Sequence, residues 1–341
     1  MNNKVEIIAE IAQAHDGSLG IAHSYIDALQ GSGVDTIKFQ MHIAEYESSA
    51  HEQFRVNFSY EDKTRFDYWD RMGFTFEQWQ GLKQHCGDKG FNFLASPFSL
   101  KAVEWMEQLG VERYKIASGE TANFLMLDRI CKTGQSILLS TGMSSYSEIQ
   151  ETVDFIQSHK GKFEGLFQCT SAYPTPPENY GLNVLKELKN KTNVKVGLSD
   201  HSGEIYAPLA AVALGAEMLE MHVVFDKKMF GPDAASSLTI NDFIQLCQGV
   251  RKIETCLNNP IDKDNIAAFK DMKIMFGKSI TLSKDLEKGH VIQLEDLETT
   301  KPGDKGISAK VYQSIIGKVL NKNLSKHTFI QNNKLYVRKQ T

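Results

Sequence analysis

Charged and hydroxyl side chains stand at the ends of short apolar runs throughout the first two thirds of the chain. The set comprises Glu10, Lys38, Gln40, Ser96, Lys115, Ser118, Glu120, Ser140, Thr170, Ser171, Ser199, His201, Glu220 and His222. Lysine supplies positive charge and serine supplies directed donors, so the combination suits a ligand that carries phosphate and carboxylate groups. One such residue alone is more often solvated or a helix cap. All eight apolar runs end in at least one such polar residue, and this regularity favours a shared anion site.

Two histidines end consecutive runs near residues 200 and 222. If His201 and His222 lie on neighbouring strands, their imidazoles can share one divalent ion. For either residue alone, a hydrogen-bonded structural histidine is the better interpretation, and the pair in this setting favours a metal site. His15 and His42 also follow apolar runs and are weaker candidates of the same type. The other six histidines fit helices or the surface.

Two carboxylates and one aromatic residue complete the candidate chemistry. Glu10 ends an apolar run without a basic neighbour in sequence, and Glu120 follows Ser118-Gly119. Carboxylates at such a site bind sugar hydroxyls or move protons. Tyr173, in the turn after Cys169, is expected to lie over the pocket, with a purely packing role as the alternative.

The order of apolar and amphipathic segments predicts an architecture that brings these residues together. Apolar, β-branched runs alternate with amphipathic segments, which predicts repeated βα units. Eight units over about 250 residues match a (β/α)8 TIM barrel, in which the carboxyl ends of all the strands meet at one face. The expected strands are Val5–Ala9, Thr36–Gln40, Asn92–Ser96, Arg113–Ile116, Ile137–Ser140, Gly165–Cys169, Val194–Leu198 and Met218–His222. The long connection Met41–Thr75 is expected to be a lid over that face.

The pattern changes after Cys256. We expect a barrel domain over residues 1–257, a linker over 258–277 and a small domain over 278–341 with short strands punctuated by Lys288-Gly289 and Pro302-Gly303. A domain of that size buries a limited core, so it is expected to lean on another surface.

Composition excludes several other classes of protein. The 341 residues carry 42 acidic and 38 basic side chains, a formal charge of −4 without a basic block, which argues against a nucleic-acid partner. The most apolar stretch, Tyr206–Phe225, contains Glu217 and Glu220, so no membrane span is expected. Five scattered cysteines indicate reduced thiols. With Glu6 and Glu10 where a signal peptide needs an apolar core, we expect a cytoplasmic protein.

The same residues lie in segments that resemble the sialic acid synthase (N-acetylneuraminate synthase) family over nearly the whole chain. The region from about Ser279, with Ile316-Gly317-Lys318, is similar to the antifreeze-like (SAF) domain of that family. The matching barrel segments are Ile8-Ala9-Glu10-Ile11, Ile37-Lys38-Phe39-Gln40, Ser96-Pro97-Phe98-Ser99, Tyr114-Lys115-Ile116-Ala117-Ser118-Gly119-Glu120, Leu139-Ser140-Thr141-Gly142-Met143, Cys169-Thr170-Ser171-Ala172-Tyr173-Pro174, Gly197-Leu198-Ser199-Asp200-His201 and Leu219-Glu220-Met221-His222.

The resemblance implies a reaction and an assembly. Members of the family condense phosphoenolpyruvate with an open-chain N-acetylmannosamine-type sugar, giving a nine-carbon α-keto acid and phosphate. They require Mn2+ or Mg2+, a Lewis acid that polarises the aldehyde oxygen. The family also implies a homodimer in which each SAF domain caps the barrel of the partner.

Carried onto matching positions, the resemblance assigns a role to each candidate. His201 and His222 would bind the metal, and Glu10 would face the aldehyde. The residues expected to hold phosphoenolpyruvate are Lys38, Ser96, Lys115, Ser118, Ser140 and Ser199. The residues expected to contact the sugar are Gln40, Glu120, Tyr173, Asp233 and Lys301.

Several positions depart from the family pattern on the sugar side. Met221 replaces a commonly basic residue, Ala234 replaces a frequent histidine, and Lys301 stands where bacterial members usually have an arginine that contacts the N-acyl group. Lysine keeps the charge and loses the planar fork, so the acyl contact is expected to differ. The product is therefore expected to be a nonulosonic acid of the sialic, legionaminic or pseudaminic type.

Two alternatives remain at this point, one of the same enzyme class and one of a different class. A synthase acting on a phosphorylated sugar aldehyde would need a second basic cluster, and no arginine group follows the expected strands. A non-catalytic carbohydrate-binding protein would not need acids, bases and a histidine pair at one mouth. Release of phosphate from phosphoenolpyruvate separates an enzyme from a binding module.

Overall fold

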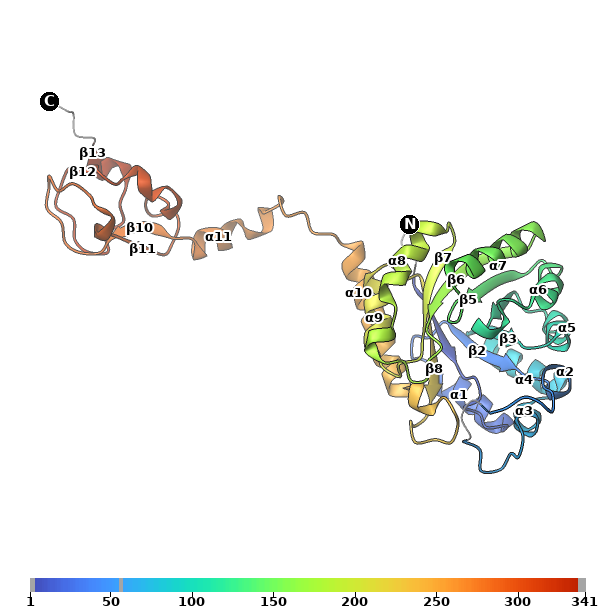
Figure 1. Ribbon diagram of the computed structural model, residues 1–341. Helices are drawn as coiled ribbons and strands as arrows, with labels where there is room; N and C mark the ends of the chain where they lie inside the picture. Colours follow the sequence, from blue (N-terminus) through green and yellow to red (C-terminus); the bar gives the residue numbers. More distant parts are fainter. Residues whose placement is uncertain (1–3, 55–57, 337–341) are drawn as a thin grey trace. The chain divides into compact units, whose positions relative to one another are not determined.

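The computed structural model describes residues 4–54 and 58–336. Eight parallel strands form a closed barrel in chain order, because β1 (Glu6–Glu10) pairs with both β2 (Thr36–Met41) and β8 (Met218–Val224) (Figure 1). The remaining barrel strands are β3 (Asn92–Pro97), β4 (Arg113–Ile116), β5 (Ser136–Ser140), β6 (Lys162–Cys169) and β7 (Lys195–Asp200). The predicted barrel is confirmed, with each strand displaced by no more than a few residues.

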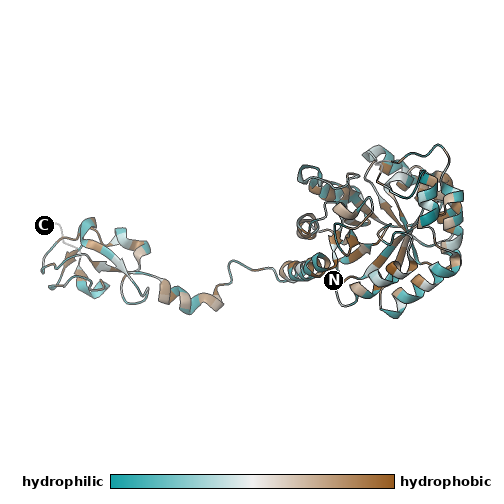
Figure 2. Ribbon diagram, turned by 90° about the horizontal axis from the view of Figure 1, so that it is seen from below, coloured by the Kyte–Doolittle hydropathy of each residue, from teal (hydrophilic) through white to brown (hydrophobic). Residues whose placement is uncertain are grey.

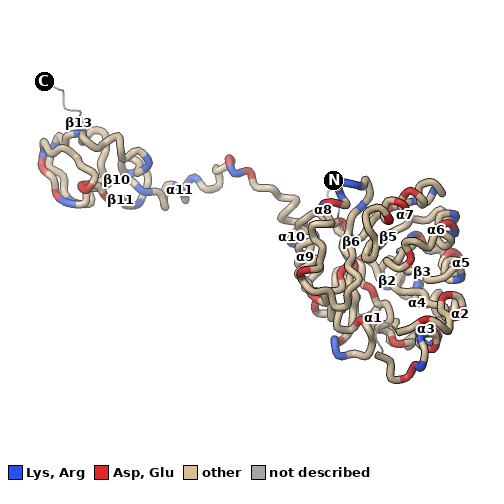
Figure 3. Tube along the Cα trace, in the orientation of Figure 1, with Lys and Arg blue, Asp and Glu red and all other residues tan. Residues whose placement is uncertain are grey.

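Helices surround the barrel on the outside, one after each strand (Figure 1). They are α1 (Leu19–Leu29), α4 (Phe76–Asp88), α5 (Leu100–Gln108), α6 (Phe124–Cys131), α7 (Tyr146–Ser158), α8 (Leu182–Lys191), α9 (Tyr206–Ala213) and α10 (Ile240–Asn258). Most begin at a side-chain cap. Ser145, for example, accepts a hydrogen bond from the backbone N–H of Glu148. Charged residues of both signs are interspersed along these helices (Figure 3).

Successive side chains of each strand point alternately outward and inward, which gives one core between strands and helices and a second inside the barrel. Along β1, Ile7 and Ala9 face the surrounding helices, whereas Ile8 points into the barrel. The interior cluster consists of Ile8, Leu94, Leu138, Phe167 and Met218, and apolar residues colour the strands brown in Figure 2. Two residues beyond Ile8 on the same face, Glu10 therefore lies above an apolar floor at the carboxyl end of the barrel.

The expected lid after β2 has its own small core. It contains α2 (Ala44–Glu47) and α3 (Arg65–Met72), and residues 55–57 lie outside the described part of the chain. Tyr68, Trp69 and Met72 of α3 pack with Ala44, and Phe58 adds a partly buried ring. Thr64 caps α3 in a reciprocal capping box with Asp67.

The structure divides into two compact units, residues 1–260 and 261–341. The second unit has two short antiparallel ribbons, β10 (Ser279–Leu282) with β11 (Leu297–Thr300), and β12 (Val319–Leu320) with β13 (Leu335–Tyr336). Its core is Ile280, Leu282, Leu286, Ile292, Ile315, Leu320, Leu324 and Ile330. The expected linker contains helix α11 (Lys270–Phe276), all of whose residues are exposed.

Two expectations about the chain as a whole can be compared with the structure. All five cysteines are free thiols, and four of them are buried. Within residues 4–54 and 58–336, no helix combines the length and the apolar character needed to cross a membrane.

Candidate active site

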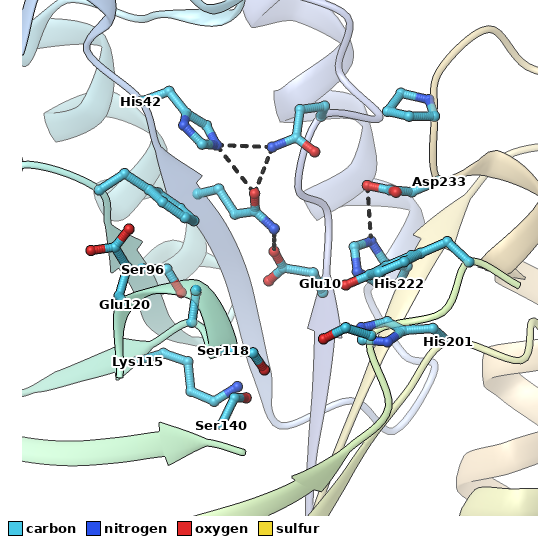
Figure 4. Close-up of a pocket in the computed structure, with 18 of the residues that line it drawn as sticks. Glu10, His42, Ser96, Lys115, Ser118, Glu120, Ser140, His201, His222 and Asp233 are labelled. Carbon is cyan, nitrogen blue, oxygen red and sulfur yellow. Dashed lines mark hydrogen bonds and ion pairs between the residues drawn. The ribbon is translucent and has the colours of Figure 1, made fainter. Parts of the chain in front are cut away.

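A cavity of about 420 Å3 opens at the carboxyl ends of the barrel strands (Figure 4). Thr170, one of the expected strand-end residues, is not part of its lining. The residues to which a role was assigned do line it, namely Glu10, Lys38, Gln40, Ser96, Lys115, Ser118, Glu120, Ser140, Tyr173, Ser199, His201, His222 and Asp233. The exception is Lys301, which belongs to the C-terminal unit, where its ammonium lies 4.8 Å from the centre of the Phe276 ring.

Two buried lysines at the floor of the cavity are paired with two buried glutamates. Lys38 Nζ donates to Glu10 Oε2 at 2.6 Å and lies 3.6 Å from Glu220 Oε1. Lys115 Nζ donates to both oxygens of Glu220, at 2.9 and 2.8 Å, and Ser199 Oγ donates to the same carboxylate at 3.2 Å. Both lysines were predicted at the site in the sequence analysis, without these carboxylate partners. Glu220, noted there without a role, is the centre of the network.

The charges in this network hold one another in place. Burial alone would raise the pKa of Glu220, but Lys115 and Lys38 hold it at about 2. Burial and the neighbouring Lys38 lower the pKa of Lys115, whereas the carboxylates of Glu10 and Glu220 raise the pKa of Lys38 against its burial. Two positive and two negative groups therefore nearly balance. An entering anion must compete with the glutamates for the lysine hydrogen bonds.

Hydroxyl groups form the side of the cavity next to Lys115 (Figure 4). Ser118 Oγ accepts a hydrogen bond from the Gly142 backbone N–H at 3.0 Å. A Cβ at Gly142 would lie 2.8 Å from that oxygen and 2.6 Å from Ser171 Oγ, so only glycine fits here. Ser96 Oγ is buried without a hydrogen-bond partner. An oxygen of a bound ligand would satisfy it.

The two histidines predicted to bind a metal ion do lie together. Their ring centres are 5.3 Å apart. His201 Nδ1 donates to the carbonyl oxygen of Thr170 at 3.0 Å, which leaves the lone pair on Nε2. Burial lowers the pKa of His201 to about 3, so the ring is neutral at physiological pH. A neutral imidazole fixed through its other nitrogen is the form that ligates metal ions.

Asp233 is the carboxylate next to this pair, with Oδ2 3.9 Å from His222 Nδ1. Within the described residues, no cluster of three or more His, Cys, Asp or Glu side chains is arranged to hold an ion. The residues present fit a divalent ion held by two protein nitrogens, with its other positions taken by water or substrate oxygens.

The two weaker metal candidates have other partners. His15 Nδ1 accepts a hydrogen bond from the Gly17 N–H at 3.1 Å, and burial lowers its pKa to about 3. His42 Nδ1 donates to Glu47 Oε1 at 2.8 Å, which leaves Nε2 to accept from Gln13 Nε2 at 3.0 Å. His15 in the loop after β1 and His42 in the loop after β2 therefore each bind other groups of the chain.

The predicted sugar-side residues occupy the rest of the mouth. Gln40 Nε2 donates to Glu10 Oε1 at 2.8 Å, so it orients the carboxylate that Lys38 also binds. Burial raises the pKa of Glu120, although a hydrogen bond from Asn123 opposes the shift. The Tyr173 ring lies 4.1 Å from that of His201 and edge-on to His222 at 6.1 Å.

Sequence reasoning missed the residues that the lid and neighbouring loops contribute to the cavity wall. They are Gln13, Glu47, Glu52, Phe58, Arg65, Tyr68, Trp69 and Phe98. The length and aromatic content of the loop indicated a lid, but nothing in its sequence identified which side chains face inward.

A parallel barrel with lysines, carboxylates, serines and a histidine pair around one cavity is typical of enzymes that act on small anionic substrates. Comparison with known families then identifies it further. Residues 25–262 match the NeuB family, and residues 277–335 match the SAF domain. The chain belongs to the NeuB family and is an enzyme of the transferase type.

Individual relatives agree with this assignment. The chain is 32% identical to the N,N'-diacetyllegionaminic acid synthase of Campylobacter jejuni over 96% of this chain and 99% of that protein. It is 31% identical to human N-acetylneuraminate-9-phosphate synthase, over 92% and 87% of the two chains. The crystal structure of N-acetylneuraminic acid synthetase from Leptospira borgpetersenii, in complex with citrate, superposes with a TM-score of 0.70 at 30% identity, covering 80% of this chain and 91% of that one.

Proposed function

We propose that this enzyme condenses phosphoenolpyruvate with an unphosphorylated, open-chain acylamino hexosamine to give a nine-carbon α-keto acid and inorganic phosphate. The observation that carries the proposal is the joint placement of Lys38, Lys115 and the unpartnered Ser96 hydroxyl beside His201 and His222 in one cavity. Relatives named N,N'-diacetyllegionaminic acid synthase and pseudaminic acid synthase support it.

The reaction balances with one water molecule. Carbon 3 of phosphoenolpyruvate forms a bond to the aldehyde carbon, and the aldehyde oxygen takes up a proton to become a hydroxyl. Water adds at carbon 2, and phosphate leaves as its C–O bond breaks. The products are one α-keto acid and one phosphate ion.

The chain supplies binding, orientation and charge for these steps. Lys38 and Lys115 would move from their glutamate partners toward the carboxylate and phosphate of phosphoenolpyruvate. The hydroxyls of Ser96, Ser118, Ser140 and Ser199 would donate to its oxygens. Glu10, held by Gln40, would face the aldehyde. Glu120, Tyr173 and Asp233 would contact the sugar, as would Lys301 from an SAF domain.

A divalent ion, Mn2+ or Mg2+, is proposed as the cofactor. His201 and His222 would hold it, and once bound it would polarise the aldehyde oxygen. The fixed tautomer of His201, with Nδ1 committed to Thr170, supports this assignment.

An unphosphorylated acceptor fits the cavity better than a phosphorylated one. Among the lid residues that the structure describes in the cavity lining, Arg65 is the only lysine or arginine, while Glu47 and Glu52 carry negative charge nearby, and Glu120 lines the same cavity. A phosphate dianion would face more carboxylates than cations there. The name of the human relative makes the phosphorylated acceptor the second candidate to test.

A swapped homodimer is proposed for the assembly. Phe269 and, on helix α11, Met272, Met275 and Phe276 are exposed in a unit with a small core, which supports a further surface to cover them. Each SAF domain would then cap the barrel of the other copy.

The direct test is acceptor-dependent release of phosphate. Full-length enzyme is incubated with phosphoenolpyruvate and Mn2+, and with a panel of unphosphorylated acylamino hexosamines and their 6-phosphates. We expect phosphate release with at least one unphosphorylated sugar and its loss on adding a chelator. Release only with a 6-phosphate would establish the second candidate instead, and the absence of release with every sugar would refute both.

A further inference from the structure

The lid side of the cavity contains a stack of four planar groups. The His42 ring lies between Trp69, 3.8 Å away at an interplanar angle of 17°, and Phe98, 4.3 Å away at 19°. The Arg65 guanidinium continues the series, with Cζ 4.3 Å from the centre of the Trp69 ring. The stack therefore joins the loop after β3 to helix α3 and holds the arginine over the Trp69 ring.

The stack leaves hydrogen-bonding capacity unused at the cavity wall. Arg65 Nε is buried without a hydrogen bond, its nearest acidic oxygen being Glu52 Oε1 at 3.4 Å. Glu47 gives one oxygen to His42, and its other oxygen, Oε2, is buried without a partner. Arg65 and Glu47 both line the cavity. A buried donor and a buried acceptor that make no hydrogen bond point to a ligand that carries both.

Two ion pairs and a capping box fix the position of helix α3, which carries Arg65. Arg71 Nη1 donates to Asp16 Oδ1 at 2.6 Å, and Arg71 Nη2 donates to Asp62 Oδ2 at 2.8 Å. Asp16 belongs to the loop after β1. The last turn of α3, which carries Arg71, is therefore bound to the barrel, while Arg65 lies in the first turn. The capping box of Thr64 fixes the helix start directly before Arg65.

We propose that Arg65 and Glu47 recognise the acylamino group of the acceptor sugar, an inference that rests on the proposed function. Arg65 donates to the acyl carbonyl oxygen, and Glu47 Oε2 accepts the amide N–H. Tyr68 and Trp69, which also line the cavity, pack against the acyl methyl. An acylamino group offers an acceptor, a donor and an apolar end in one small unit. A phosphate offers acceptors only and would lie against Glu47 and Glu52.

The test compares Arg65→Gln and Arg65→Lys with wild type and with a control, Arg129→Gln. Arg129 is on outer helix α6 and pairs with Glu107, away from the cavity lining. Each protein is assayed with N-acetylmannosamine and with mannose, which has a hydroxyl in place of the acylamino group. The KM values for sugar and phosphoenolpyruvate are measured, along with the Kd of N-acetylmannosamine by calorimetry.

We expect Arg65→Gln to raise the KM and Kd of N-acetylmannosamine about tenfold or more, because a hydrogen bond to a charged donor is lost. The KM of phosphoenolpyruvate should stay within about twofold, the penalty should vanish with mannose, and Arg65→Lys should recover part of the affinity because it keeps the charge. Equal effects on both sugars, or an unchanged Kd, would overturn the inference.

Direct binding separates this inference from the proposed function. If wild type binds N-acetylmannosamine and Arg65→Gln does not, but no phosphate is released, the recognition stands and the proposed reaction fails. If wild type turns over an acylamino sugar and Arg65→Gln has unchanged constants, the reaction stands and the role of Arg65 is refuted. Absence of binding to wild type would also refute it. Circular dichroism confirms that each variant is folded.

Discussion

Glu220 accepts two hydrogen bonds from the Lys115 ammonium, at 2.8 and 2.9 Å, across the interior of the barrel. Lys115 is on β4 and Glu220 on β8, four strands apart in a ring of eight, so the two side chains meet from opposite walls. Each side chain is less than a tenth exposed. This pair closes the floor of the cavity and sets the charge that any anionic substrate meets.

Replacing Glu220 with Gln should destabilise the barrel by about 3–5 kcal/mol, since Lys115 and Lys38 lose a buried counter-charge. All three tryptophans, Trp69, Trp79 and Trp105, belong to the barrel unit, so their fluorescence during denaturant unfolding reports on the barrel alone. The control is Glu107→Gln at an exposed ion pair, where a change below about 1 kcal/mol is expected. A Glu220→Gln variant as stable as this control would contradict the role of the network.

Replacing both His201 and His222 with Ala should abolish chelator-sensitive turnover and binding of Mn2+, because the two nitrogen ligands are lost. Binding is measured by calorimetry on protein treated with chelator beforehand. His159→Ala, on the exposed end of α7, serves as the matched control and should bind the ion like wild type. Retained metal-dependent activity in the double variant would show that the ion is held elsewhere.

The C-terminal unit should lose stability in acid through Asp296. Burial alone would raise the pKa of this carboxyl, but Lys284, the Gln293 N–H and His290 hold it at about 2. Because the pKa is lower in the folded than in the unfolded state, the stabilisation is present above about pH 4 and is lost as the pH falls toward 2. Its size is roughly 2 kcal/mol.

Asp296→Asn should remove this dependence. Calorimetric unfolding of the full chain between pH 5 and pH 2 follows the transition of the C-terminal unit. The control is Asp304→Asn, at an exposed aspartate of the same unit, which should keep the wild-type slope. An unchanged slope for Asp296→Asn would disprove the assignment.

The proposed exchange of SAF domains predicts complementation between two defective chains. A Lys301→Ala chain keeps an intact barrel, and a His201→Ala chain keeps an intact SAF domain. If each barrel uses the SAF domain of the other copy, mixing the two should restore one competent site per heterodimer, although each alone is impaired. Sedimentation analysis verifies that heterodimers form. If the activity of the mixture is no higher than the sum of the two separate activities, Lys301 either serves the active site of its own chain or serves no active site.

The barrel and the positions of the strand-end residues could be predicted because both depend on local periodicity. A polar residue just after an apolar run marks the carboxyl end of a strand, and in a parallel barrel all these ends meet at one face. That is why Glu10, Lys115 and His222 were expected at one mouth, where the structure places them.

Partners across the barrel could not be predicted in the same way. Lys115 and Glu220 are 105 residues apart. The period of a strand predicts which face of the sheet a side chain lies on, but not which side chain of another strand it contacts. The lid is harder still, because an irregular loop has no period. Nothing in the sequence around Arg65 indicates that it stacks on Trp69, or that His42 forms a hydrogen bond with Glu47.

The central claim is that carbon 3 of phosphoenolpyruvate becomes bonded to the sugar aldehyde carbon in this cavity. The most direct measurement uses phosphoenolpyruvate labelled with 13C at all three carbons, together with Mn2+ and an unphosphorylated acylamino hexosamine, and mass spectrometry of the products. We predict one nine-carbon α-keto acid carrying three labelled carbons for each phosphate released. Labelled pyruvate as the sole product, with the sugar recovered unchanged, would contradict the claim.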